Sequence, residues 1–473
     1  MSEASSTIAK FDRRIVEGSL SQAVWRLAWP TMVQNVIAGL QGIIDQAMVG
    51  HYVGFIGNAA VGASLQIFIL VIVFVASVFT GMGVLVARFA GAGDPEKVNR
   101  VVYQALLVSL FLFLGILAPI GYLAAPTLLT LINAAPEVQI EAVPFIRIMF
   151  ASSIGMLLFF KFGSALRAAG DSRTPMRLGI LATALNILLN VLLIPVFGTA
   201  GAAIGTAIAN LTVAVIFIRL IFSNRLVIQF SRSMSFHPDW AVIRSLFRFG
   251  LPAGFQGIVM NLGGVLMLRF IGSLPESAEA QAVYAVGYTE LFSLVTWTSV
   301  GLMGAAAAVA GQNLGAGHPQ RSADGVRVAA MIGVCGASAI GLLFLTVPHV
   351  LFAVFGMTDD RVVALGRQLL AYLAVSGLFV TVALTYTGGL QGTGDTRGPL
   401  YISLFSQVVV PVGLCAVLQA MRGLQASDIW LAIVIGHFTR GALSVLRFRR
   451  GRWREISVDI EVERGSIAPA AVE

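Results

Sequence analysis

Residues 170–175 of the chain read GDSRTP, and residues 394–399 read GDTRGP. A second pair of segments is separated by the same interval, because GAGDP at 91–95 recurs as GAGHP at 315–319. Chance similarities would not share one offset across half of the chain. The two halves of the sequence are therefore repeats of each other.

The two halves also begin alike, with Pro30 and Gln34 in the first half and Pro252 and Gln256 in the second. The offset between these pairs is smaller by two, so the second half gains two residues, most simply in the loop after its first helix. Proline removes one helical hydrogen bond and permits a kink. We expect Pro30 to be a hinge of its helix, with a static kink as the alternative.

The composition is that of an integral membrane protein. Of 473 residues, 57% are hydrophobic and 11% are charged, whereas a soluble domain carries about a quarter charged residues. Too few charges remain to cover a surface that faces water. The composition excludes a soluble enzyme, a disordered chain and a nucleic-acid-binding protein, and it makes membrane lipids the expected neighbours.

Long apolar stretches predict an all-α integral membrane fold. A spanning helix needs about 20 apolar residues, and peptide groups inside a bilayer must be hydrogen-bonded within the segment. The stretch 178–218 carries no charge and is long enough for two spans, and GTAG at 198–201 divides it. We expect twelve transmembrane helices, six in each repeat, at 22–50, 59–86, 98–124, 140–161, 175–197, 200–222, 245–272, 281–311, 324–350, 362–388, 397–421 and 427–447.

Charges at the ends of the spans predict the orientation. Alternate loops carry basic residues such as Arg173 and Arg321, whereas the loops between them carry acids such as Glu137 and Glu276. By the positive-inside rule both termini are cytoplasmic. Two parallel six-helix repeats form two bundles with a shared cavity, the layout of transporters whose bundles rock against each other. The expected parts are a cytoplasmic N-terminal tail at 1–20, a first lobe at 21–222, a cytoplasmic linker at 223–244, a second lobe at 245–447 and a cytoplasmic basic tail at 448–473.

One acid lies inside an apolar span, Asp45 in LQGIIDQAMVG at 40–50. It follows Pro30 by fifteen residues, about 22 Å at 1.5 Å per residue, so it falls in the outer half of the span. An ionised acid at mid-span costs about 2.5–3.5 kcal/mol, which makes a functional role the default. Because burial disfavours the charged form of a carboxyl group, we expect Asp45 to exchange a proton near neutral pH.

Other polar residues of the first half recur at spacings of four and seven, which places them on shared helix faces. We expect them to form a polar pocket inside the first lobe. The alternative is ordinary interhelical hydrogen bonding, worth about 0.6 kcal/mol per contact. The candidate pocket residues are Gln34, Gln41, Asn186, Asn190, Thr206 and Asn210.

The second half differs in its chemistry. The offset between the two starting segments places Met267 opposite Asp45. Glu290 is the one acid well inside a span of this half, either as a second titratable site or as a side chain that extends to the outer interface. This asymmetry indicates ion chemistry in the first half and mainly apolar contacts in the second. Gln256, Met260 and Met267 are the candidate residues, since methionine adapts to varied apolar ligands.

The sequence predicts neither catalysis nor a metal site. No paired catalytic acids or nucleophile–base set is present, Cys335 and Cys415 lie alone, and the five histidines are scattered. The repeated glycine-rich loops follow membrane helices and not strands, unlike dinucleotide-binding loops. We expect tight turns there, with Asp171 and Asp395 capping the helices that follow. The chain is expected to be no enzyme and to hold no cofactor or metal ion.

These features together resemble the multidrug and toxic compound extrusion (MATE) family. The resemblance rests on the six-plus-six repeat, on the first-helix pattern of Pro30, Gln41, Asp45 and Val49-Gly50, and on the paired Gly-Asp-x-Arg-x-Pro loops. It covers about residues 15–450 and is strongest to the prokaryotic DinF-like branch. It implies a multi-pass protein of the bacterial inner (plasma) membrane that exports organic, often cationic or amphipathic, compounds.

The resemblance also implies that Asp45 is the ion-coupling residue. In the family, inward H⁺ or Na⁺ drives export, and neighbouring polar positions fall on Gln41, Asn186, Asn190 and Thr206. Many relatives carry a second acid where this chain has Asn190. With one acid in the pocket we expect H⁺ as the coupling ion and keep Na⁺ as the alternative, since hard cations prefer several oxygen ligands. Small organic substrates are the expected partners of a monomeric protein.

Other functions stay open at this point. A lipid-linked precursor flippase of the same superfamily would need more spans or a cationic cavity. A major facilitator would carry a basic Gly-Arg-Arg type motif between its second and third spans, which residues 91–100 lack. A membrane scaffold without transport activity would not release protons when a substrate binds.

Overall fold

The computed structural model describes residues 11–223, 225–230, 237–458 and 460, and at 69–76 it describes the backbone. Throughout these ranges the regular structure is helical. The helices of the first half are α1 (Arg14–Glu17), α2 (Leu20–Tyr52), α3 (Phe55–Gly91), α4 (Pro95–Leu112), η1 (Phe113–Leu117), α5 (Ala118–Leu131), α6 (Pro136–Ser152), α7 (Ile154–Ala168) and α8 (Arg173–Phe222).

The second half contains a matching series of helices. They are α9 (Trp240–Gly272), α10 (Ser277–Tyr284), η2 (Ala285–Leu291), α11 (Ser293–Gly315), α12 (Pro319–Thr346), α13 (Pro348–Ala353), α14 (Asp360–Thr393), α15 (Arg397–Leu404), η3 (Phe405–Val409), α16 (Val410–Arg422), α17 (Ala426–Arg449) and η4 (Arg452–Glu455). The segments η1, η2 and η3 are π-helical. Each of them joins two α-helices into one longer run.

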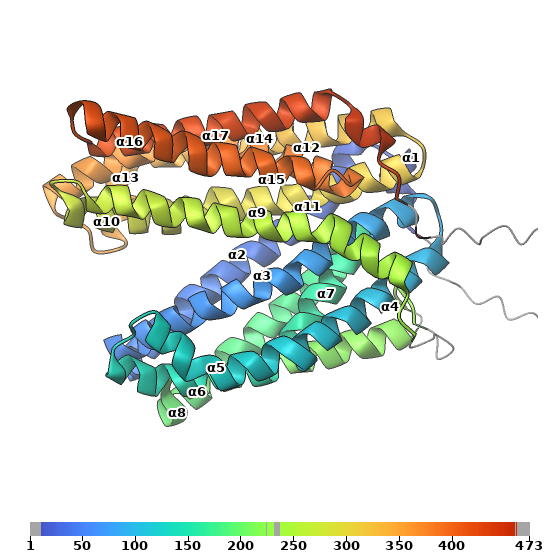
Figure 1. The fold of residues 1–473 in the computed structure, drawn as a ribbon, viewed down its shortest axis with the longest axis horizontal. Coiled ribbons are helices and arrows are strands. Elements are labelled where there is room, and N and C mark those ends of the chain that lie inside the picture. The colour runs from blue at the N-terminus through green and yellow to red at the C-terminus, as the bar shows by residue number, and fades with distance from the viewer. Residues whose placement is uncertain (1–10, 224, 231–236, 459, 461–473) are drawn as a thin grey trace, which may run out of the picture.

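The helices form two bundles that lie side by side (Figure 1). Helices α2 to α8 make the first lobe, and α9 to α17 make the second. The spans of the first lobe are α2, α3, the run from α4 to α5, the pair α6–α7 and the two arms of α8. Those of the second are α9, the run from α10 to α11, α12, α14, the run from α15 to α16, and α17. The predicted all-α membrane fold of two six-helix bundles is confirmed.

Two breaks explain why helices and spans differ in number. Gly198 has a φ of +58° inside the long helix α8, a backbone conformation that glycine adopts at little cost. The two arms of α8 therefore pack against each other, with Asn186 of one arm bonded to Thr206 of the other. Helices α6 and α7 meet at 51° and together make one span. The segment at 198–201 predicted the first of these breaks.

The repeated loops turn and cap the following helices as predicted. Gly170 and Gly394 have φ values of +103° and +105°. The Asp171 carboxyl accepts hydrogen bonds from the Arg173 and Thr174 backbone N–H groups, both at 3.0 Å. Asp395 accepts one from the Gly398 N–H at 3.0 Å. These loops fix the ends of helices, and their chemistry is structural.

The two lobes touch where α3 of the first lobe crosses α9 and α11 of the second. A Cβ atom built on Gly91 would lie 1.9 Å from the carbonyl oxygen of Gln312, and one built on Gly315 would lie 2.0 Å from that of Arg88. The two contacts are equivalent, because the repeat offset that relates the GAGDP and GAGHP loops relates both pairs of residues. Gln312 also donates from Nε2 to the Ala168 carbonyl at 2.7 Å, which joins the lobes again. Backbone contact of this kind requires glycine at both positions.

The described part of the N-terminal segment docks on the helices. Ile15 of α1 is 2% exposed and packs in a cluster with apolar residues of α2, α11 and α12. Asn313 Nδ2 donates to the Ile15 carbonyl at 3.2 Å, and Arg321 donates to the Gly18 carbonyl at 2.7 Å. One apolar side chain and two carbonyl groups therefore dock the segment. Residues 1–10 lie outside the described residues.

The C-terminal segment docks at the same end of the molecule (Figure 1). Trp453 is 1% exposed, and its Nε1 donates to the Phe448 carbonyl at 2.8 Å. Arg88 of the first lobe donates to the Ile456 carbonyl at 3.4 Å, so the predicted basic tail bridges the lobes. Residues 459 and 461–473 of this predicted tail lie outside the described residues.

The linker between the lobes is anchored to α4. Arg100 forms an ion pair with Asp239, and Gln104 Nε2 donates to the His237 carbonyl at 2.9 Å. Asp239 also caps α9, which begins at Trp240 and thus before the predicted boundary at 245. Residues 224 and 231–236 of the predicted linker lie outside the described residues.

Gly91→Ala should destabilise the protein, because the new Cβ would meet the Gln312 backbone, which cannot rotate away. Overpacking costs about 1–3 kcal/mol, so we expect a lower Tm for the purified variant. The matched control is Gly83→Ala on the same helix, where a Cβ meets no atom within 4 Å. Equal Tm values for the two variants would contradict the crossing contact.

Candidate functional site

The half-buried carboxyl group of Asp45 is held between α2 and the first arm of α8. Asn190 Nδ2 donates a hydrogen bond to Asp45 Oδ1 at 2.7 Å. The side chain of Gln41, one turn earlier on α2, also hydrogen-bonds this carboxyl group. Two amide side chains from two helices therefore orient the one acid of the site.

The polar network continues along α8. Asn190 also donates to Asn186 Oδ1 at 3.3 Å, and Asn186 Nδ2 donates to Thr206 Oγ1 at 2.9 Å. With its amide group turned over, Asn186 places Nδ2 3.0 Å from Asp45 Oδ1. Asn186 and Asn190 are 1% and 0% exposed. The structure thus brings together five predicted residues, which are Gln41, Asp45, Asn186, Asn190 and Thr206.

Thr183 is a member of the network that the sequence analysis missed. Its hydroxyl donates to Gln41 Oε1 at 2.7 Å, which leaves the Gln41 amide nitrogen free to face Asp45. The available signal was its spacing, since Thr183 lies one turn before Asn186 on the same face of α8.

Gly205 on the second arm of α8 makes room for the network. A Cβ atom at this position would lie 2.2 Å from Asn190 Oδ1. That oxygen is buried and has no hydrogen-bond partner among the described residues. The amide oxygen of Asn190 thus faces the glycine, and its nitrogen faces Asp45.

Two predicted pocket residues lie apart from this network. Asn210 donates to the Thr206 carbonyl of its own helix at 3.0 Å. Gln34 accepts a hydrogen bond from Arg167 of α7 at 3.4 Å, two turns from Gln41 along α2. Pro30 lies inside α2, which remains helical on both sides of it.

Lys161 is a buried basic residue in the first lobe that the sequence analysis overlooked. It is 0% exposed, and its Nζ donates to the Val102 carbonyl at 2.8 Å. The predicted fourth span ended at this residue, whereas the structure continues α7 to Ala168. Because the predicted span ended too early, Lys161 was expected at the end of a helix, whereas it lies inside one.

The predicted residues of the second lobe are dispersed. Gln256 donates to Ser403 Oγ at 2.8 Å and accepts from Gln391 at 2.9 Å. Met267 is buried in the core, whereas Met260 is 38% exposed. Glu290 lies half-buried in η2, and within the described chain its carboxyl group makes no hydrogen bond or ion pair.

The second lobe also buries basic side chains that were not among the predicted site residues. α17 carries His437 and Arg440 near its middle, 4% and 2% exposed. The sequence analysis treated this histidine as one of a scattered set and did not consider the arginine, because neither has a partner nearby in sequence. A buried basic side chain therefore lies inside each lobe.

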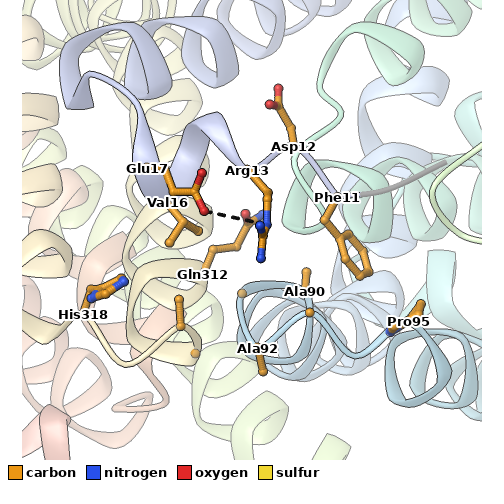
Figure 2. Close-up of a pocket in the computed structure, with 14 residues that line it drawn as sticks. Phe11, Asp12, Arg13, Val16, Glu17, Ala90, Ala92, Pro95, Gln312 and His318 are labelled. Carbon is orange, nitrogen blue, oxygen red and sulfur yellow. Dashed lines mark ion pairs between the residues drawn. The ribbon is translucent and has the colours of Figure 1, made fainter.

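A cavity of about 840 Å³ lies at the end of the molecule that carries the docked termini. The repeated loops of both lobes and the N-terminal segment line it (Figure 2). Arg13 and Glu17 form an ion pair of 3.7 Å there, and a surface pair of this kind contributes little stability. None of its lining residues belongs to the Asp45 network.

Two six-span bundles related by a parallel repeat, with a hydrogen-bonded acid inside one of them, define a multi-pass membrane transporter. The model of the MatE family matches residues 30–192 and 252–417, more than half of the chain. The protein therefore belongs to the MatE, or MATE, family of transporters and is not an enzyme.

Relatives agree with this assignment. The probable multidrug resistance protein NorM of Thermotoga maritima is 26% identical over 447 residues, covering 92% of this chain and 93% of that protein. The multidrug export protein MepA of Staphylococcus haemolyticus is 26% identical over 456 residues, covering 91% and 96%. A solved structure described as the outward-facing conformation of a multidrug resistance MATE family transporter superposes with a TM-score of 0.86 at 21% identity, covering 93% and 98%. That likeness concerns the fold.

Proposed function

We propose that this protein is a secondary active antiporter that exports organic, often cationic or amphipathic, compounds in exchange for protons. Relatives named for multidrug resistance and export support the substrate class. The observation that carries the coupling is the hydrogen bond from Asn190 Nδ2 to Asp45 Oδ1 at 2.7 Å. It holds a single carboxyl group inside a polar pocket of the first lobe.

The orientation of the amide groups favours H⁺ over Na⁺. A bound cation needs oxygen ligands turned toward it, whereas an amide nitrogen can only donate hydrogen bonds. Asn190 turns its nitrogen toward Asp45 and its oxygen toward Gly205. Thr183 occupies the Gln41 oxygen in the same way. The donors present suit a carboxylate that alternates between an ionised and a protonated state.

The proposed cycle begins with ionised Asp45. Hydrogen bonds to a charged acceptor are roughly twice as strong as neutral ones, so the bond from Asn190 to Asp45 holds α2 against α8 in this state. A proton from outside neutralises the carboxyl group and weakens that hold. α2 then bends near Pro30, the pocket collapses, the substrate leaves, and the lobes rock about the crossing of α3 and α11. The membrane potential supplies about 2.3 kcal/mol per charge per 100 mV.

The proposal places the protein in the bacterial inner membrane as a monomer with both termini in the cytoplasm. The basic loops with Arg173, Arg321 and Arg397 lie at the end where the described termini dock, and basic residues mark the cytoplasmic side. The lobes are in contact at this end through Gly91 and Gly315. The conformation is then closed to the cytoplasm.

Asp45→Asn should abolish proton-driven export, because the amide cannot take up or release a proton. The variant and the wild type are reconstituted in liposomes, and ethidium movement is followed while an inward proton gradient is imposed. We expect at least a tenfold lower rate for the variant, and no acceleration of the wild type by a sodium gradient.

The control for this test is Asp324→Asn, which removes an exposed acid paired with Arg327. It should transport like the wild type. Wild-type rates for Asp45→Asn would show that this residue has no role in the mechanism. Export by the wild type that is driven by a sodium gradient would show that Na⁺, and not H⁺, is the coupling ion.

Gly205→Ala should impair export while leaving Asp45 in place. The added methyl group displaces the Asn190 side chain and breaks its bond to the carboxyl group. A hydrogen bond to a charged group is worth about 1.5–3 kcal/mol, so export should fall by about tenfold or more. Gly62→Ala in α3, where a Cβ meets no atom within 4 Å, is the matched control. Equal ethidium rates for both variants would show that the Asn190 contact has no role.

A further inference from the structure

Arg440 is a buried cation without a counter-charge. It lies mid-way along α17, is 2% exposed, and makes no hydrogen bond or ion pair with any described residue. Its Nε atom is shielded from solvent and has no acceptor within the described chain. Arginine keeps its proton in proteins, and an uncompensated charge buried in a membrane protein is costly. Such a residue calls for a ligand that supplies the missing acceptors.

A histidine that stacks with aromatic rings lies one turn from this arginine on α17. His437, one turn earlier on α17, hydrogen-bonds through Nδ1 with the hydroxyl of Ser376 on α14. Its ring stacks near Tyr288 and Phe292, with centroid distances of 6.5 and 6.1 Å. These neighbours provide a flat aromatic wall and no carboxylate.

A second buried donor lies on the same face of α17. The Nε2 atom of Gln407 in η3 is buried without an acceptor among the described residues, and it is 3.7 Å from a Cβ built on Gly436. Gly436 precedes Arg440 by one turn, and long side chains on a helix point back toward its N-terminus. Arg440 and Gln407 are therefore donors without acceptors that come from two helices and point toward the same region. A group with several acceptor oxygens would satisfy both.

The backbone around this region is π-helical on two sides. Tyr288 belongs to η2 and Gln407 to η3. π-Helical turns inside α-helices are frequently found at functional sites. They widen the turn and redirect side chains, here those of Tyr288 and Gln407.

We infer that Arg440 holds an anionic oxygen group, a carboxylate or a phosphate, of a ligand bound inside the second lobe. The guanidinium fork bonds such groups in a bidentate manner, Gln407 supplies a further donor, and Tyr288, Phe292 and His437 contact an aromatic or apolar body. This inference deepens the proposed function, on which it rests for the idea that the ligand is transported. It assigns acidic or zwitterionic amphipathic compounds to the substrate class.

The experiment compares two fluorescent probes that differ by one charge, ciprofloxacin and its methyl ester. Binding to the purified full-length protein in phosphatidylcholine nanodiscs is measured by fluorescence anisotropy without any ion gradient. We expect the wild type to bind the carboxylate at least tenfold more tightly than the ester. Arg440→Gln should remove this preference and leave ester binding unchanged, whereas Arg440→Lys, which keeps the charge and loses the fork, should retain part of it.

The matched control is Arg361→Gln, which removes an exposed arginine at the start of α14 and should keep the preference. Equal binding of both probes by the wild type, or a preference that survives in Arg440→Gln, would overturn the inference. Should Arg440→Gln fail to fold, Gln407→Leu is expected to weaken carboxylate binding severalfold with no change for the ester, and an unchanged ratio would again contradict the site.

A further arm identifies the source of the anionic group. Phosphatidylglycerol nanodiscs that displace the carboxylate probe in the wild type and not in Arg440→Lys support a lipid phosphate as the occupant of the same site. Unchanged affinity in those nanodiscs supports a free small molecule. Failure of proton-driven export together with an intact carboxylate preference would refute the proposed function and leave the binding site standing.

Discussion

The arrangement of this molecule depends on the backbone contact between α3 and α11. Gly91 and Gly315 each bring their helix against a carbonyl group of the other, at Gln312 and Arg88, and the repeat makes the two contacts equivalent. Any side chain larger than hydrogen would separate the lobes here. The contact brings backbone against backbone at these glycines, and the crossing of α3 with α9 does the same at Gly81 and Gly250. Together these crossings hold one end of the two bundles together.

This crossing explains why both chain termini dock where they do. The N-terminal segment inserts Ile15 beside α11, and the C-terminal segment offers the Ile456 carbonyl to Arg88 of the first lobe. Both segments span the seam between the lobes at the end that the glycines close. Opening of this end requires that the segments part from one lobe.

The fold and the residues around Asp45 could be predicted from the sequence, because both depend on regular spacing. The repeat offset, the uncharged stretches and the i, i+4 pairs predicted twelve spans and the set around Asp45. The features that the sequence did not predict depend on single residues that follow no periodic pattern. Lys161 lies at the predicted end of a span, so its burial was not expected. Arg440 has no charged partner at helical spacing, and Ile15 is a single apolar residue in a charged segment. Which polar atoms face each other, such as Thr183 and Gln41, depends on how helices rotate when packed, and sequence spacing does not determine that rotation.

The Asp45 carboxyl group and the Arg440 guanidinium group are different kinds of charge, and the roles proposed for the two lobes differ accordingly. A carboxyl group can gain or lose its charge, whereas a guanidinium group cannot. Of these two groups, only Asp45 can therefore change state when the proton concentration changes, so the proposed coupling signal starts in the first lobe. In the proposed cycle Arg440 contributes a constant charge, and its hold on an anionic group changes only when the lobe around it moves. In the proposed cycle, coupling links the acid to the second lobe through α2 and the α3–α11 crossing, and binding in the second lobe then acts on the acid by the same free energy.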